Sequence, residues 1–204
     1  MLYRGWAKIL TNPLASDHGF SLKKSYNCSN GLREVHLKVN MTIHLLEITE
    51  TAIGKPSPNI KPRLDRWKLM ARCTSSNPDS CHFLNQIYTL GKSNRVDAKS
   101  ALSAINKLLQ VAQTGQPLES FYDEKQSHPI HTFEYQGAKR VLWRVRQGDV
   151  RLVFYYAEGK IIFLTDALAK RQDKLTDGEK TKLENELKTY IDAEQANKIC
   201  VIQS

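Results

Sequence analysis

Residues 139–171 read KRVLWRVRQGDVRLVFYYAEGKIIFLTDALAKR. Three runs of β-branched and aromatic residues alternate with breaks at Gly148 and Gly159, a pattern typical of an antiparallel meander. Eight Lys and Arg residues stand in this segment against three acidic residues, a net +5 of the +9 carried by the chain. Because the cations lie within strands, we expect a rigid surface to carry the positive field.

A two-residue hairpin loop at Gly148 and Asp149 determines which residues of the first two strands lie opposite each other. Alternation then separates an apolar face from a face that carries arginines and Tyr155. Two arginines opposed across strands repel each other, so their pairing indicates a site that holds an anion. The predicted pairs are Gln147 with Val150, Arg146 with Arg151, Val145 with Leu152, Trp143 with Phe154, and Leu142 with Tyr155.

The second break in the meander predicts another two-residue loop, at Glu158 and Gly159. This loop sets Tyr156 against Ile161 and extends the apolar face. A three-residue loop is the alternative. It shifts the register of one strand by one residue, so that the side chains of this strand exchange faces of the sheet.

The composition favours a globular chain with a polyanion as partner. The chain has 204 residues and a pI near 9.4, which makes nucleic acid the first candidate and an anionic membrane surface the second. No apolar run is long enough to span a bilayer and no secretory signal is evident, so we expect a cytoplasmic protein. The cysteines at 28, 73, 81 and 200 lack zinc-site spacing and are interpreted as reduced thiols, mostly buried.

The order of elements is expected to be β-α-α, then three or four antiparallel strands, then α. Asn77 and Pro78 predict one helix start, and a second helix runs from about Asn94 to Gln113. Thr176 and Glu179 form a capping box that begins the last helix.

Three regions follow from this order. Residues 1–64 are interpreted as a poorly ordered or mis-assigned extension, with Met41 as an alternative start; residues 65–197 form the folded domain, and residues 198–204 a tail. The prolines between Lys55 and Pro62 favour a linker or lead-in arm.

The phrases LWRVRQGDVRLVFYY (142–156), KIIFL (160–164) and LAKRQDKLT (168–176) resemble the RelE/ParE toxin superfamily, in particular its HigB-like, phage-derived branch. The resemblance covers about residues 66–192. It implies an α+β, RelE-like fold with a small, mostly antiparallel sheet packed against an N-terminal helix pair and a C-terminal helix.

The same resemblance implies the toxin of a type II toxin–antitoxin system, which cuts messenger RNA on the ribosome and inhibits translation. In this family a ribose 2′-hydroxyl attacks the adjacent phosphate, with no metal and no cofactor. The implied partners are ribosome-bound messenger RNA and an antitoxin with a helix-turn-helix domain; no membrane is involved.

This chemistry needs cations on the scissile phosphate and groups that remove and deliver protons. Lys139, Lys170 and Tyr155 are open alternatives for proton transfer. The predicted catalytic residues are Arg146, Arg151, Tyr155 and Lys170, the predicted RNA- and phosphate-binding residues are Lys139, Arg140, Arg144 and Arg171, and no metal ligand is predicted.

One departure from the family pattern bears on activity. Asp166, Ala167 and Leu168 stand where HigB-like chains often have His-Gly-Phe, and an acid among the cations weakens the field or orients an arginine. The alternative hypothesis is therefore a gyrase-directed or catalytically degenerate protein that acts by binding.

Overall fold

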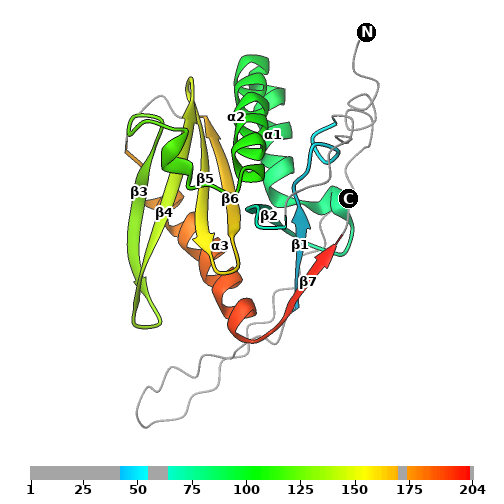
Figure 1. Ribbon diagram of the computed structural model, residues 1–204, viewed down its shortest axis with the longest axis vertical. Helices are drawn as coiled ribbons and strands as arrows, with labels where there is room; N and C mark the ends of the chain where they lie inside the picture. The colour runs from blue at the N-terminus through cyan, green and yellow to red at the C-terminus, as the bar shows by residue number, and fades with distance from the viewer. Residues whose placement is uncertain (1–41, 55–63, 170–173, 203–204) are drawn as a thin grey trace, which may run out of the picture. The chain divides into compact units, whose positions relative to one another are not determined.

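The computed structural model describes residues 42–54, 64–169 and 174–202, which belong to one compact unit. A seven-stranded mixed sheet runs through it in the order β3-β4-β5-β6-β2-β1-β7 (Figure 1). The strands are β1 (Ile43–Glu47), β2 (Lys68–Cys73), β3 (Ser127–Tyr135), β4 (Ala138–Gln147), β5 (Val150–Ala157), β6 (Ile161–Ala169) and β7 (Ile199–Ile202).

Three α-helices cover the two faces of this sheet. α1 (His82–Ser93) and α2 (Arg95–Gln113) form a pair on one face, and α3 (Asp177–Gln195) lies on the other (Figure 1). The Asn94 side chain caps α2, and Thr176 with Glu179 forms the predicted capping box of α3. Asn77 caps a short 3₁₀ turn, Pro78–Ser80, so α1 itself begins later than the Asn-Pro signal predicted.

Each face of the sheet has its own apolar core. Val145, Leu152 and Phe154 pack with the α1–α2 pair, whereas Leu142, Val153 and Phe163 pack with α3. Neighbours along one strand therefore belong to different cores, as the two-residue period of a strand requires. Among the described residues, no helix has the length and apolarity needed to cross a membrane.

The first predicted loop is confirmed and the second is wrong. Gln147 pairs with Val150, and Trp143 pairs with Phe154, as a turn at Gly148 and Asp149 requires. At the next turn, Ala157 pairs with Ile161 and leaves a three-residue loop. Gly159 and Lys160 both adopt positive φ there (70° and 58°), so a glycine signal alone did not give the loop length.

The predicted small RelE-like sheet with an N-terminal helix pair is also wrong. The antiparallel meander is one part of a larger mixed sheet, because β2 pairs in parallel with β6 and β7 pairs in parallel with β1. Two strands precede the helix pair in sequence. Parallel partners are joined by long connections and leave no turn signal in the sequence, which is why the pattern missed them.

The sheet includes one strand from the region predicted to be an N-terminal extension (residues 1–64) and one from the region predicted to be a tail (residues 198–204). β1, from the region assigned to the extension, is hydrogen-bonded between β2 and β7, and β7 comes from the assigned tail. Leu45 and Leu46 of β1 are buried, one in each core. The rest of the predicted extension, residues 1–41 and 55–63, lies outside the described residues.

Candidate functional site

Three arginines gather at the end of the sheet where β4 finishes and β5 begins. Arg146 and Arg151 are direct partners across the two strands, and Arg144 lies two residues before Arg146 on the same side. All three alternate with Val145 and Leu152, which belong to the other core, so the arginines lie on the face covered by α3. We call Arg144, Arg146 and Arg151 the arginine cluster.

His128 fixes the position of Arg144. Nε of Arg144 donates to Nε2 of His128 at 2.9 Å, and Nδ1 of His128 lies 2.8 Å from the backbone oxygen of Glu124. Arg144 is 7% exposed. The imidazole therefore orients a largely buried guanidinium at the start of β3, where His128 pairs with Arg144 across the strands.

The two opposed arginines differ sharply in accessibility. Arg151 is 2% exposed, whereas Arg146 is exposed and its Nε donates to the backbone oxygen of Gly148 at 2.9 Å. This bond ties the Arg146 side chain to the β4–β5 turn. Within the arginine cluster, Arg146 is the member best placed to touch a dissolved anion.

Asp166 lies on the same face, one strand beyond β5. It pairs with Val153, which also pairs with Arg144, so two strand spacings of about 10 Å in total separate the backbones of Asp166 and Arg144. Asp166 is 1% exposed; one oxygen accepts from the amide of Ala167 at 2.8 Å and the other from Nζ of Lys182 at 2.6 Å. Lys182 of α3 thus balances the buried carboxylate.

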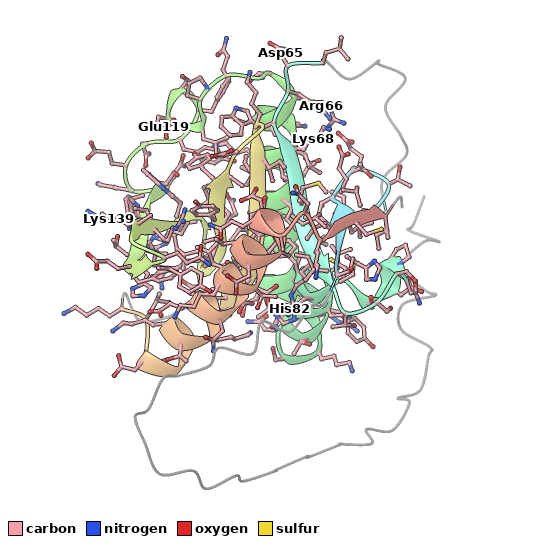
Figure 2. All side chains as sticks on the ribbon, turned by 90° about the horizontal axis from the view of Figure 1, so that it is seen from below. Asp65, Arg66, Lys68, His82, Glu119 and Lys139 are labelled. Atoms are coloured by element: carbon pink, nitrogen blue, oxygen red, sulfur yellow. The ribbon has the colours of Figure 1, made fainter. Side chains whose placement is uncertain are left out.

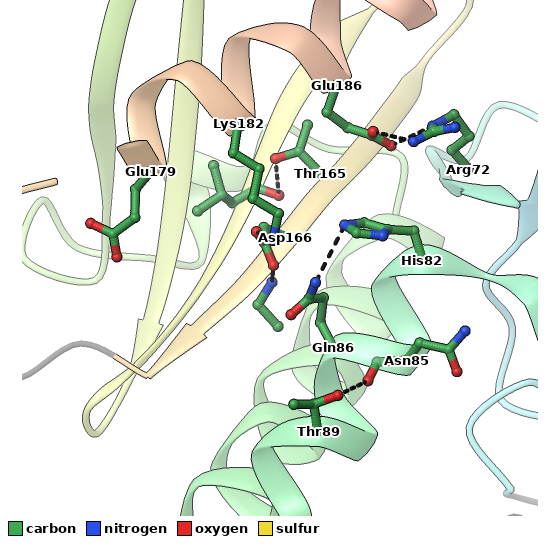
Figure 3. A network of polar contacts seen from close by, with 12 residues as sticks. Arg72, His82, Asn85, Gln86, Thr89, Thr165, Asp166, Glu179, Lys182 and Glu186 are labelled. Atoms are coloured by element: carbon green, nitrogen blue, oxygen red, sulfur yellow. Dashed lines mark hydrogen bonds and ion pairs between the residues drawn. The ribbon is translucent and has the colours of Figure 1, made fainter. Parts of the chain in front are cut away.

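A cleft of about 490 Å³ lies beside this ion pair, between α3, β6, the end of β2 and the start of α1. Figure 3 shows Lys182 reaching to Asp166 and Arg72 facing Glu186 across the cleft. Arg72 makes two bonds to Glu186, Nε to Oε1 at 2.8 Å and Nη2 to Oε2 at 2.7 Å. The Glu186 hydrogen bond raises the pKa of the Arg72 guanidinium.

Among the described residues, the predicted site residues Lys139, Arg140 and Tyr155 do not join the arginine cluster. Lys139 is seven residues from Arg146 along β4, about 23 Å at 3.3 Å per residue, and Figure 2 shows it at the margin of the molecule. Nη1 of Arg140 donates to the Tyr155 hydroxyl at 3.2 Å, but Tyr155 is four residues from Arg151, about 13 Å along β5. Lys170 and Arg171 lie outside the described residues.

The sequence interpretation gave no role to several polar residues around the site. Lys182 of α3 bonds to Asp166 of β6, and Glu186 of α3 bonds to Arg72 of β2. The helical spacing did indicate a buried position for Glu186, because this residue lies three positions after Leu183 and four before Tyr190 on the buried stripe of α3. For His128 and Arg72 no local signal exists, since each contact joins residues distant in sequence.

The described residues contain no group of three or more His, Cys, Asp or Glu side chains arranged to hold a metal ion. Comparison with protein-family models, with curated proteins and with solved structures finds no match. The site consists of three guanidinium groups, one exposed (Arg146) and two buried (Arg144 and Arg151). The cleft on the same side of the sheet is lined by Asp166 and Glu186, which are bonded to Lys182 and Arg72.

Proposed function

We propose that this protein is the toxin of a type II toxin–antitoxin pair, a metal-independent endoribonuclease that cuts messenger RNA on the ribosome in the cytoplasm. The proposal rests on the resemblance of residues 142–176 to HigB-like toxins and on one observation. Arg146 and Arg151 are opposed across β4 and β5, and Arg144 stands beside them held by His128.

Such a cluster suits a phosphodiester whose negative charge increases during cleavage. The planar fork of Arg146 can grip two phosphate oxygens at the surface, while the buried Arg144 and Arg151 add positive potential from below, where screening by water is weak. In this proposal Arg146 contacts the scissile phosphate, and the other two act at longer range.

Asp166 need not weaken this field. Its carboxylate is bonded to Lys182 at 2.6 Å, so the pair contributes no net charge beside the arginines. Lys139, Lys170 and Tyr155 stay the alternatives for the proton-transfer steps. Tyr155 requires the RNA to extend about 13 Å along β5 from Arg151.

A second candidate is a gyrase-directed or catalytically degenerate protein that acts by binding. The burial of Arg144 and Arg151 favours it, because two of the three clustered cations are closed off from a dissolved substrate. Under both candidates we expect an antitoxin with a helix-turn-helix domain to cover the exposed basic surface.

The test is inducible expression in a bacterial host, with growth recorded and the 5′ ends of cellular messages mapped. Arg146→Ala is the decisive variant because its side chain is exposed and its loss leaves both cores intact. Lys139→Ala is the matched control, a basic residue of the same strand about 23 Å away. Arg151→Ala is unsuitable, since it removes a side chain that is 2% exposed and endangers folding.

Growth arrest with new cuts inside translated codons, lost in Arg146→Ala and kept in Lys139→Ala, supports the nuclease. Arrest with filamentation and DNA damage but intact messages supports the gyrase-directed candidate. Absence of arrest from a chain that circular dichroism shows to be folded contradicts the toxin proposal.

A further inference from the structure

Cys73 and Cys81 face each other across a short antiparallel bridge. Cys73 is the last residue of β2, and Cys81 directly precedes α1. The flanking hydrogen bond joins the Thr74 amide to the Ser80 oxygen at 3.2 Å, so the two cysteines occupy a non-hydrogen-bonded position. At such positions Cα atoms are about 4.5 Å apart and side chains approach most closely, within the range of about 4.4–6.8 Å that a disulfide spans.

The segment between the cysteines holds them in this register. Asn77 caps the turn Pro78–Ser80 through the Asp79 amide at 3.0 Å. The Ser80 hydroxyl accepts from the Ser75 amide at 3.1 Å and donates to the Asn77 oxygen at 2.6 Å. Closing a disulfide therefore requires little further ordering of the chain.

The two thiols are chemically unequal. A hydrogen bond from the Cys81 thiol lowers the pKa of Cys73, with smaller contributions from Ser80 and Arg72 in the same direction. The same bond, together with burial, raises the pKa of Cys81. Cys73 also directly follows Arg72 and is the less buried of the two thiols (3% against 0% exposed), so we assign Cys73 as the nucleophile and Cys81 as the thiol that reacts second.

We propose that Cys73 and Cys81 are a redox-modification site that forms a reversible intrachain disulfide when hydrogen peroxide is the oxidant. The Cys73 thiolate attacks one peroxide oxygen and releases hydroxide, which leaves a sulfenic acid on Cys73. The Cys81 sulfur then attacks the Cys73 sulfur; the sulfenic oxygen leaves as water with the Cys81 proton. Overall, two thiols lose two electrons and two protons, and one peroxide becomes two waters.

The site adjoins the cleft beside α3. Arg72 precedes Cys73 and His82 follows Cys81, and both line the cleft. The pair itself is buried (3% and 0% exposed), but Thr74, Ser75, Ser76, Asn77 and Asp79 of the connecting segment are exposed. A small oxidant can therefore reach the thiols with a movement of this segment alone. The inference does not depend on the proposed nuclease activity.

The test uses the full folded chain, treated with hydrogen peroxide, then unfolded, alkylated with iodoacetamide and digested with trypsin. Residues 73–92 contain both cysteines and no internal Lys or Arg, so one peptide reports the pair. We expect this peptide to lose two hydrogens and both alkylation sites, and to regain them with dithiothreitol. Cys200, which is exposed, shows in the same sample that the peroxide dose was sufficient.

Two variants test whether Cys73 reacts with peroxide before Cys81 does. Cys81→Ser should trap a sulfenic acid on Cys73 that dimedone labels, whereas Cys73→Ser should leave Cys81 alkylatable. Cys200→Ser is the matched control and should leave the 73–92 disulfide unchanged. The inference is overturned if the wild-type peptide keeps both alkylation sites while Cys200 is oxidised, or if Cys73 pairs with Cys200 instead. Labelling of Cys81 in Cys73→Ser would overturn the assignment of Cys73 as the nucleophile.

Discussion

At the scale of single residues, the hydrogen bond between Arg144 and His128 specifies a tautomer. A guanidinium can only donate, so Nε2 of His128 must accept from Nε of Arg144. The ring proton then lies on Nδ1, which donates to the Glu124 oxygen at 2.8 Å. We expect the nitrogen chemical shifts of His128 in neutral buffer to report a neutral ring protonated on Nδ1.

His131 provides an internal comparison for this measurement. Its Nε2 lies 2.8 Å from the Glu184 carboxylate, an acceptor, so this nitrogen must carry a proton. The two rings should therefore give different patterns in one spectrum. A proton on Nε2 of His128 would contradict the bond to Arg144 and remove the argument that His128 positions this guanidinium.

Tyr190 anchors α3 to the sheet through its ring. The ring is fully buried and stacks on Phe163 with centroids 4.3 Å apart, and its hydroxyl donates to Glu194 at 2.7 Å. We expect Tyr190→Ala to lower the free energy of unfolding by about 3–5 kcal/mol, as removal of a large buried ring does. Tyr190→Phe, which loses only the hydroxyl bond, should cost about 1 kcal/mol in urea titrations. Equal costs for both variants would contradict a packing role.

At the scale of elements, polar contacts fasten α3 to both sides of the arginine cluster. Glu184 bonds to His131 of β3, and Glu186 bonds to Arg72 of β2. These contacts lie on the helix between Leu183 and Leu187, which fill the core beneath it. The helix is therefore held in place across the strands that carry the arginines.

The Glu184 contact makes part of this attachment dependent on pH. Hydrogen bonds from His131 and then Lys188 lower the pKa of Glu184 below its ordinary value of 4.5. Because the folded pKa lies below the unfolded one, the stabilisation is complete above about pH 4.5 and is lost as the pH falls through the folded value. Its size stays below about 1 kcal/mol, since solvent screens a side chain that is 24% exposed.

Urea unfolding between pH 3 and pH 6 measures this contribution. In Glu184→Gln, the free energy of unfolding should fall less steeply as the pH decreases from 6 to 3 than it does in the wild type. Glu134→Gln is the matched control, an exposed glutamate of the same strand that carries His131, and should keep the wild-type slope. A wild-type slope in Glu184→Gln would show that the carboxylate does not hold α3.

Elements with a local signal were the ones that the sequence predicted well. The Gly148 turn and the Thr176 capping box are confirmed, because each depends on residues a few positions apart. β7 was missed, and the segment of β1 (within residues 35–53) was left open between a strand pair and a helix, since both strands are short and their parallel pairing joins residues more than 150 positions apart in the chain. The arginine-bearing face was predicted correctly, but its cover by α3 was not, because the contacts of His128 and Arg72 are long-range.

At the scale of the whole molecule, much of the positive charge belongs to the segment that forms β4, β5 and β6. Residues 139–171 carry +5 of the net +9, and two acids on the α3 side of the sheet are bonded to cations, Asp166 to Lys182 and Glu186 to Arg72. This arrangement predicts binding of a polyanion that depends strongly on salt.

Binding of a fluorescent single-stranded RNA, titrated at several salt concentrations, tests this prediction. For single strands the logarithm of the association constant falls by about 0.7 per unit of log salt for each phosphate neutralised. Arg146 is the exposed member of the arginine cluster, so Arg146→Ala should reduce the magnitude of the slope by about 0.7. Lys139→Ala, in the same strand but about 23 Å away, should leave the slope unchanged if the RNA contacts only the cluster. Equal reductions in the two variants would mean that the RNA follows the whole length of β4, which would extend the binding surface to Arg140 and Tyr155. An unchanged slope in Arg146→Ala would exclude the exposed guanidinium as a phosphate contact.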